Sequence, residues 1–246
     1  MKLKFKIDSN YFIVHTLASM ANDRFSSMEH KKEIVDFQNF AWKESENCYD
    51  LLAGRIYLER FIDKTFVDAI KDISRFLTKL QKSVEYQKIF KQTRDYLEFC
   101  QKQWDKNYEL TIKIMEKLTG LKFNKSFIVY ITHPSLKNGC YLGKNKIAWG
   151  HNEDWPNYSV VYLWHEILHS YFSNSEIEHA LISFATDEEL RIRLNGGKYP
   201  PFVTHKELFP LMKKILPFWR EYINSKKKNL LDFKNKLIKV IKKPPL

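Results

Sequence analysis

The sequence predicts an α+β fold that is mostly helical, and three observations support this prediction. All eight prolines lie at or after Pro134, and only two of the seven glycines precede residue 121, so the first half of the chain contains few residues that interrupt helices. Apolar residues in that half recur every three or four positions, which is the spacing of amphipathic helices. Residues 126–149 are instead rich in β-branched and aromatic side chains, as strands are.

Length and composition exclude several classes of protein. The chain has 246 residues, of which 44% are hydrophobic and 15% aromatic, enough to bury a core, so a disordered protein is excluded. No apolar run is long enough to span a membrane, and the first residues do not form a clean signal peptide. Cys48, Cys100 and Cys140 are odd in number and widely spaced, which argues against a disulfide framework. We therefore expect a cytoplasmic location.

The chain carries a formal net charge of +12, which raises the question of a polyanionic partner. Lysines alternate with acidic residues through most of the sequence, and the dense basic runs are Lys226–Lys228 and Lys242–Lys243. This diffuse distribution favours a solvated surface. We expect no specific nucleic-acid partner and no membrane span.

The order of elements divides the chain into two regions. Long amphipathic helices are expected across about residues 30 to 118, ending at Thr119 and Gly120. A strand is expected over 126–132, followed by a hairpin of two short strands, at 140–142 and 146–149. We assign a helical N-terminal region to residues 1–120 and a metal-binding region to residues 121–246.

Three further helices are expected in the second region. One covers 160–172, after a turn and N-cap within 154–159. A second covers 176–194 and ends at Asn195-Gly-Gly197. The last places Leu230, Phe233, Leu237 and Ile241 on one stripe.

The helix at 160–172 carries the most informative motif, His165-Glu166-Ile167-Leu168-His169. Residues four apart lie on the same helix face, so the two imidazoles can bind one zinc ion from the same side. Glu166 adjoins the first histidine, where its carboxylate can act as a general base toward water. The alternative is a pair of structural histidines with satisfied hydrogen bonds in a core.

Residues 126–197 resemble the zincin metallopeptidases, and within them the gluzincins. The resemblance implies a zinc cofactor, with His165 and His169 as ligands and Glu166 as general base. It also implies a small sheet whose edge strand binds the substrate backbone, an active-site helix, and a third ligand from a glutamate on a later helix.

Glu189 is the preferred third ligand, because it follows His169 by twenty residues, a separation similar to that in thermolysin. Geometry favours another residue. In a tight helical hairpin with its turn at 173–175, position 181 lies opposite the midpoint of the two motif histidines, so His179 is closer than Glu189. Glu178, Asp187 and Glu188 are weaker candidates. Glu178 is alternatively a capping-box partner of Ser175, and Asp187 and Glu188 are alternatively a solvated face or acceptors for a ligand histidine.

Gluzincins also place a downstream donor to stabilise the oxyanion of the reaction intermediate. The candidates are Tyr199, Arg191, Arg193 and His205, of which we select His205. Its alternative role is that of a turn residue after Pro200-Pro201-Phe202.

The sequence thus predicts a zinc metallopeptidase that hydrolyses a peptide or protein substrate, with Glu166 as the general base. The substrate is not encoded in any motif. The alternative is a non-catalytic protein that keeps a zincin-like scaffold and binds nucleic acid or an anionic surface through its basic tail.

Overall fold

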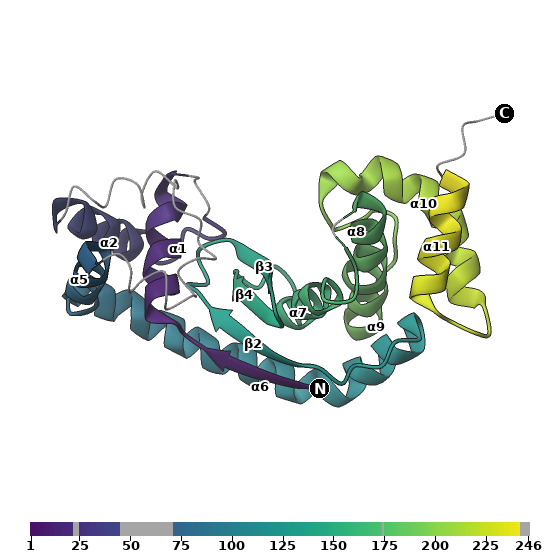
Figure 1. The fold of residues 1–246 in the computed structure, drawn as a ribbon, viewed down its shortest axis with the longest axis horizontal. Helices are drawn as coiled ribbons and strands as arrows, with labels where there is room; N and C mark the ends of the chain where they lie inside the picture. Colours follow the sequence, from purple (N-terminus) through teal and green to yellow (C-terminus); the bar gives the residue numbers. More distant parts are fainter. Residues whose placement is uncertain (22–24, 45–70, 174, 242–246) are drawn as a thin grey trace. The chain divides into compact units, whose positions relative to one another are not determined.

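The computed structural model describes residues 1–21, 25–44, 71–173 and 175–241, and its fold is mostly helical α+β with a small mixed four-stranded sheet (Figure 1). The predicted fold class is therefore confirmed. Three features of the sequence lie outside the described residues: Cys48, the apolar positions from Ile62 to Ile70, and the basic pair Lys242–Lys243.

The chain forms two compact units, and each draws on separate stretches of sequence. One, here called the sheet unit, contains residues 2–101 and 127–152. The other, the site unit, contains Met1, residues 102–126 and residues 153–246. The strands thus group with the first helices of the chain, and the histidine motif groups with the C-terminal helices.

The sheet unit contains α1 (Ser9–Ala21), α2 (Lys31–Glu44), α5 (Lys71–Gln81) and the first part of α6 (Val84–Thr119). Helices α2, α5 and α6 fall within the helical region predicted from periodicity, whereas α1 precedes it. Buried apolar side chains from these helices form one core cluster that includes Phe12, Ile13, Leu17, Ile34, Phe37, Leu77, Leu80 and Ile89.

The sheet contains β1 (Lys2–Lys6), β2 (Ser126–Ile131), β3 (Asn138–Gly143) and β4 (Lys146–Gly150) in the order β1-β2-β4-β3. Strand β2 pairs with β4 in parallel, and β3 pairs with β4 as an antiparallel hairpin. The strand and the hairpin predicted from β-branched and aromatic content are confirmed. Strand β1 was not predicted.

In the site unit, α6 ends at Thr119, as the sequence predicts, because Gly120 takes a left-handed conformation with φ of 71°. A Cβ atom at this position would lie 2.0 Å from the carbonyl oxygen of Lys228. Only glycine therefore permits both the conformation and the close approach of the two backbone segments.

The remaining helices of the site unit are α7 (Tyr158–Leu168), α8 (Glu176–Ser183), a π-helical segment (Phe184–Leu190), α9 (Arg191–Asn195), a 3-10 turn (Lys206–Leu208), α10 (Phe209–Asn224) and α11 (Leu230–Ile241). Segments α8 to α9 continue one another, so the predicted helix over 176–194 is confirmed, and Gly196 ends it with φ of 79°. In the described part of the chain, no helix combines the length and the apolar content needed to cross a bilayer.

Candidate metal centre

The N-terminus of α7 is stabilised by side chains that precede the helix or lie on α6. Asn157 is the N-cap, within the predicted turn, but it is left-handed and its side chain makes no capping bond. The carboxylate of Glu153 accepts from the backbone N–H of Ser159 at 3.0 Å and also from its hydroxyl. Gln103 donates to Glu153 at 2.9 Å and accepts from the N–H of Val160 at 3.2 Å. The first donors of the helix are thus satisfied, and the negative charge lies at the positive end of the helix dipole.

The turn between α7 and α8 is short, because a capping box at Ser175 starts α8. Ser175 accepts from the N–H of Glu178, and the Glu178 carboxylate accepts from the N–H of Ser175 at 3.3 Å. The capping-box role considered for Glu178 is therefore confirmed. The same carboxylate accepts from Lys234 of α11 at 3.1 Å and from the Ser173 hydroxyl.

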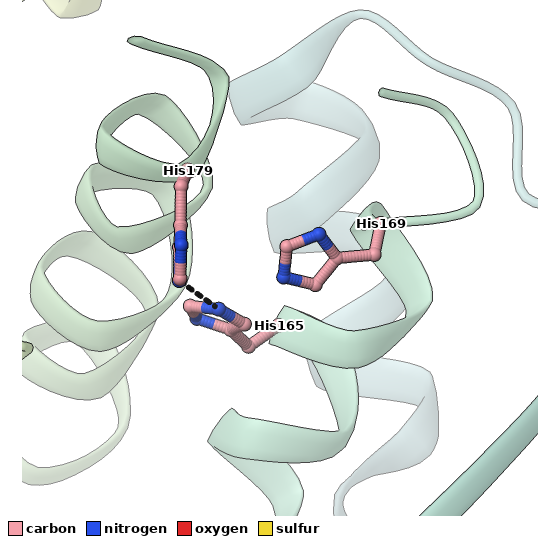
Figure 2. A group of neighbouring side chains, drawn as sticks. All are labelled: His165, His169 and His179. Atoms are coloured by element: carbon pink, nitrogen blue, oxygen red, sulfur yellow. Dashed lines mark hydrogen bonds between the residues drawn. The ribbon is translucent and has the colours of Figure 1, made fainter. Parts of the chain in front are cut away.

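This tight hairpin brings His179 of α8 against the two histidines of α7. The ring centroids of His165, His169 and His179 are 5.1 to 5.2 Å apart in every pair, nearly an equilateral triangle. One ring nitrogen of each lies within 4.8 Å of the others, and the Nε2 atoms of His165 and His179 are 3.1 Å apart (Figure 2). His165 is buried and the other two are half-buried. These three histidines can hold a metal ion.

The opposite nitrogen of His165 is bound by a buried carboxylate. Its Nδ1 lies 3.0 Å from Oδ1 of Asp187, which also accepts from the Thr186 hydroxyl at 2.9 Å. Burial would raise the pKa of Asp187, but the charge of His165 and hydrogen bonds from Thr204 and Thr186 lower it below its ordinary value. Because an ionised carboxylate only accepts, the Nδ1–H of His165 donates to it; in the neutral form of this imidazole, the lone pair that binds a metal is then on Nε2.

Glu166 follows His165 directly in α7 and is almost wholly buried, with 7% of its surface exposed. Burial would lower the pKa of His165, whereas the charges of Asp187 and Glu166, with the Asp187 hydrogen bond, raise it above its ordinary value. Glu166 is thus close enough to His165 for its charge to act on the imidazole.

Glu189 and Glu188 lie outside the group of three histidines. Glu189 accepts from Arg193 at 2.9 Å and from the Tyr199 hydroxyl at 2.5 Å. Glu188 accepts from Arg191 at 3.0 Å and from the N–H of Val203 at 2.8 Å. Of the two residues favoured for the third ligand position, His179 and not Glu189 therefore lies with the motif histidines.

The π-helical segment explains how three consecutive acidic residues bind different neighbours. All seven of its residues are buried, including Asp187, Glu188 and Glu189, so the alternative of a solvated acidic face is wrong. Asp187 points to His165, and the two glutamates hold residues 199–203. Thr186 lies inside this segment, and its hydroxyl donates to the backbone carbonyl of Ile182 at 2.8 Å.

Among the proposed oxyanion donors, His205 is the one beside the histidine group. Its ring packs edge-on against His179 with centroids 5.1 Å apart, and its side chain is half exposed. Arg191, Arg193 and Tyr199 are instead bound to the buried glutamates. The Ser183 hydroxyl bonds that of Thr204 at 2.8 Å, which fixes the residue before His205.

Glu153 and Gln103, which stabilise the N-terminus of α7, were not identified from the sequence. Gln103 lies 57 positions before the backbone group that it binds, and no local pattern links it to α7. Glu153 lies outside the predicted cap at 154–159, although an acidic residue just before a helix is an available signal.

Comparisons with known proteins supply no family for this site: no protein-family model, curated protein or solved structure matches the chain.

Proposed function

We propose that the protein is a zinc-dependent hydrolase of peptide bonds in which His165, His169 and His179 hold the metal and Glu166 is the general base. The observation that carries the proposal is the triangle of imidazoles with a carboxylate on the far side of one ring. A buried carboxylate that orients a histidine is the usual support of a histidine ligand.

The donor set fits zinc. In a tetrahedral site with Zn–N bonds of about 2.0–2.1 Å, two nitrogen ligands lie roughly 3.3 Å apart. The Nε2 atoms of His165 and His179 are 3.1 Å apart, close to that separation. Three protein ligands are the number found in catalytic zinc sites, which keep a further position open. The half exposure of His169 and His179 is consistent with an open side.

We prefer His179 to Glu189 as the third ligand for two reasons. His179 is already in the group, whereas the Glu189 carboxylate is engaged by Arg193 and Tyr199. Burial lowers the pKa of His179 to about 4, with the neighbouring His165 and His205 acting in the same direction. The imidazole is therefore neutral at pH 7, as a metal ligand must be.

A zinc ion held by His165, His169 and His179 would supply Lewis acidity toward the scissile carbonyl. Three further functions fall to other side chains of this protein. Glu166 takes a proton from the attacking water and later returns it to the leaving amine. His205, half exposed beside His179, would donate a hydrogen bond to the developing oxyanion. Asp187 holds the ring of His165 and its proton at Nδ1.

The proposal is tested by a paired measurement on wild type and Glu166→Gln. Zinc content is measured by mass spectrometry of the metal, and cleavage is measured on a mixed peptide library. We expect one zinc per chain in both proteins and a loss of cleavage by about two to four orders of magnitude in the variant, because glutamine cannot accept the proton. Equal cleavage by the variant would remove Glu166 from the reaction. Stoichiometric zinc without cleavage by the wild type would favour a non-catalytic metal-binding protein.

A further inference from the structure

The last two long helices of the site unit enclose a groove that the metal centre does not use. It has a volume of about 750 Å³. Its apolar lining consists of Phe218 and Tyr222 of α10 and of Phe233, Leu237 and Val240 of α11. Tyr222 and Leu237 form its buried floor, whereas Phe218, Phe233 and Val240 retain exposed surface. Tyr222 and Phe233 stack with ring centroids 4.6 Å apart, so an aromatic pair forms part of the wall.

The apolar residues follow the two helices lengthwise. Phe233, Leu237 and Val240 occupy positions i, i+4 and i+7 of α11, a length of about 10 Å along the helix axis. Phe218 and Tyr222 are likewise four positions apart on α10, so they lie on one face of that helix. A groove of this form accepts the apolar face of another helix, whose anchors follow the same spacing. Val240 is 50% exposed, so the groove is open to a partner at its end.

Charge indicates the nature of that partner. Lys227, Lys228 and Lys236 line the groove together with Glu221 and Asp232. The whole helical pair, residues 209–241, carries nine lysines and arginines against two acidic residues. A segment with acidic residues beside its apolar ones would therefore be attracted here, and a basic segment would be repelled.

We propose that the groove between α10 and α11 is a docking site for an acidic, amphipathic segment of a partner protein. Duplex nucleic acid matches the lysines but presents no apolar side chains for Phe233 and Val240, which retain exposed surface. A lipid surface is flat, whereas this apolar surface is recessed between two helices. The proposal does not depend on the proposed hydrolase activity.

The experiment measures fluorescence anisotropy of a labelled peptide of glutamate, alanine and leucine, with leucines at helical spacing. The protein is the full chain at physiological ionic strength. We expect saturable binding to wild type, and at least ten-fold weaker binding of two control peptides. One control replaces every glutamate by lysine, and the other is polyglutamate of the same length.

A matched pair of variants tests the location. Lys236→Glu reverses a charge in the groove, whereas Lys239→Glu makes the same change on the same exposed helix outside it. We expect about ten-fold weaker peptide binding for the first and less than about three-fold for the second. Val240→Gln tests the apolar wall, with Val84→Gln, 67% exposed and far from the groove in sequence, as its control. Circular dichroism confirms that each variant is folded.

Several outcomes overturn the proposal. Equal losses for Lys236→Glu and Lys239→Glu, or polyglutamate binding as tightly as the leucine peptide, would mean unspecific attraction to a basic surface. Tighter binding of duplex DNA, or of phosphatidylserine vesicles, than of the peptide at the same ionic strength would assign the basic helices to that class of partner instead. Absence of peptide binding by wild type would exclude the docking site.

Discussion

Asp187 accepts a hydrogen bond from Nδ1 of His165 at 3.0 Å, and both side chains are buried. This contact joins the first histidine of the HExxH motif to a residue 22 positions later, across the hairpin of α7 and the π-helical segment. It fixes both the orientation of the ring and the nitrogen that carries the proton. The two helices are thereby held together at the point where the histidines converge.

The first prediction concerns this contact. Asp187→Asn keeps the shape of the side chain but removes the charge that supports His165, so zinc affinity should fall by about 10- to 100-fold. Affinity is measured by competition with a chromophoric chelator. Glu188→Gln is the control, because it makes the same change at the neighbouring buried carboxylate, which binds Arg191 and Val203 instead. Equal losses in the two variants would mean that the effect is one of general destabilisation.

The second prediction separates the two candidates for the third ligand. His179→Ala should abolish stoichiometric zinc, since it removes one of only three ligands. Glu189→Ala should retain zinc and instead lower thermal stability, because Tyr199 and Arg193 lose their acceptor. Zinc content and melting temperature are measured on the same preparations. Zinc retained by the first variant and lost by the second would restore the ligand role that the sequence favours for Glu189.

The third prediction concerns His205. His205→Ala should keep zinc and lower kcat by about 10² or more, with KM little changed, if its imidazole donates to the oxyanion. Lys206→Ala removes an exposed neighbour and should leave both constants near wild type. A rise in KM with unchanged kcat would instead assign His205 to substrate binding.

The sequence predicted the fold class, the strands after residue 126 and the motif helix, because each depends on local periodicity. It missed α1 because Tyr11, Phe12, Ile13 and Val14 are all buried, so this helix has no alternation of apolar and polar faces. It missed β1 because a lysine-rich stretch of five residues is a weak strand signal.

At the candidate site, the sequence identified the two motif histidines and left the third ligand open. The position of His179 depends on where α8 begins, and the capping box of Ser175 and Glu178 fixes that start. The roles of Asp187 and Glu188 depend on a π-helical segment. Three adjacent acidic residues in a sequence usually indicate a solvated helix face. No local sequence pattern indicates that these three are buried.

The fourth prediction tests the support of α7. Glu153→Gln removes the negative charge at the N-terminus of α7. Glu153 now accepts hydrogen bonds from Ser159 and Gln103, and in the variant the amide NH₂ group would face one of these two donors. We expect a loss of about 1 kcal/mol in the free energy of unfolding, measured by urea denaturation of metal-free protein. Asp154→Asn, an exposed neighbour, should change stability by less than about 0.5 kcal/mol.

The last prediction concerns His133, which follows β2 in the sheet unit and is wholly buried. Its Nδ1 accepts from the N–H of Ser135 at 3.1 Å, so its proton is on Nε2, which donates to Gln92 at 3.0 Å. Protonation of Nδ1 would break the bond to Ser135. Burial, together with the charges of His30 and His15, lowers the pKa of His133 to about 3.

The sign of the pH dependence follows from this lowered pKa. Between the ordinary value of about 6.5 and the folded value of about 3, the unfolded chain binds a proton that the folded chain does not. The contribution of neutral His133 to the free energy of unfolding is therefore fully present above pH 6.5. It falls as the pH drops through this window, by at most ~1.4 kcal/mol per pH unit. His133→Asn retains an acceptor for Ser135 but cannot be protonated. Urea denaturation between pH 7 and pH 5 should show a shallower decline for the variant, and identical slopes would exclude His133 as a source of acid sensitivity.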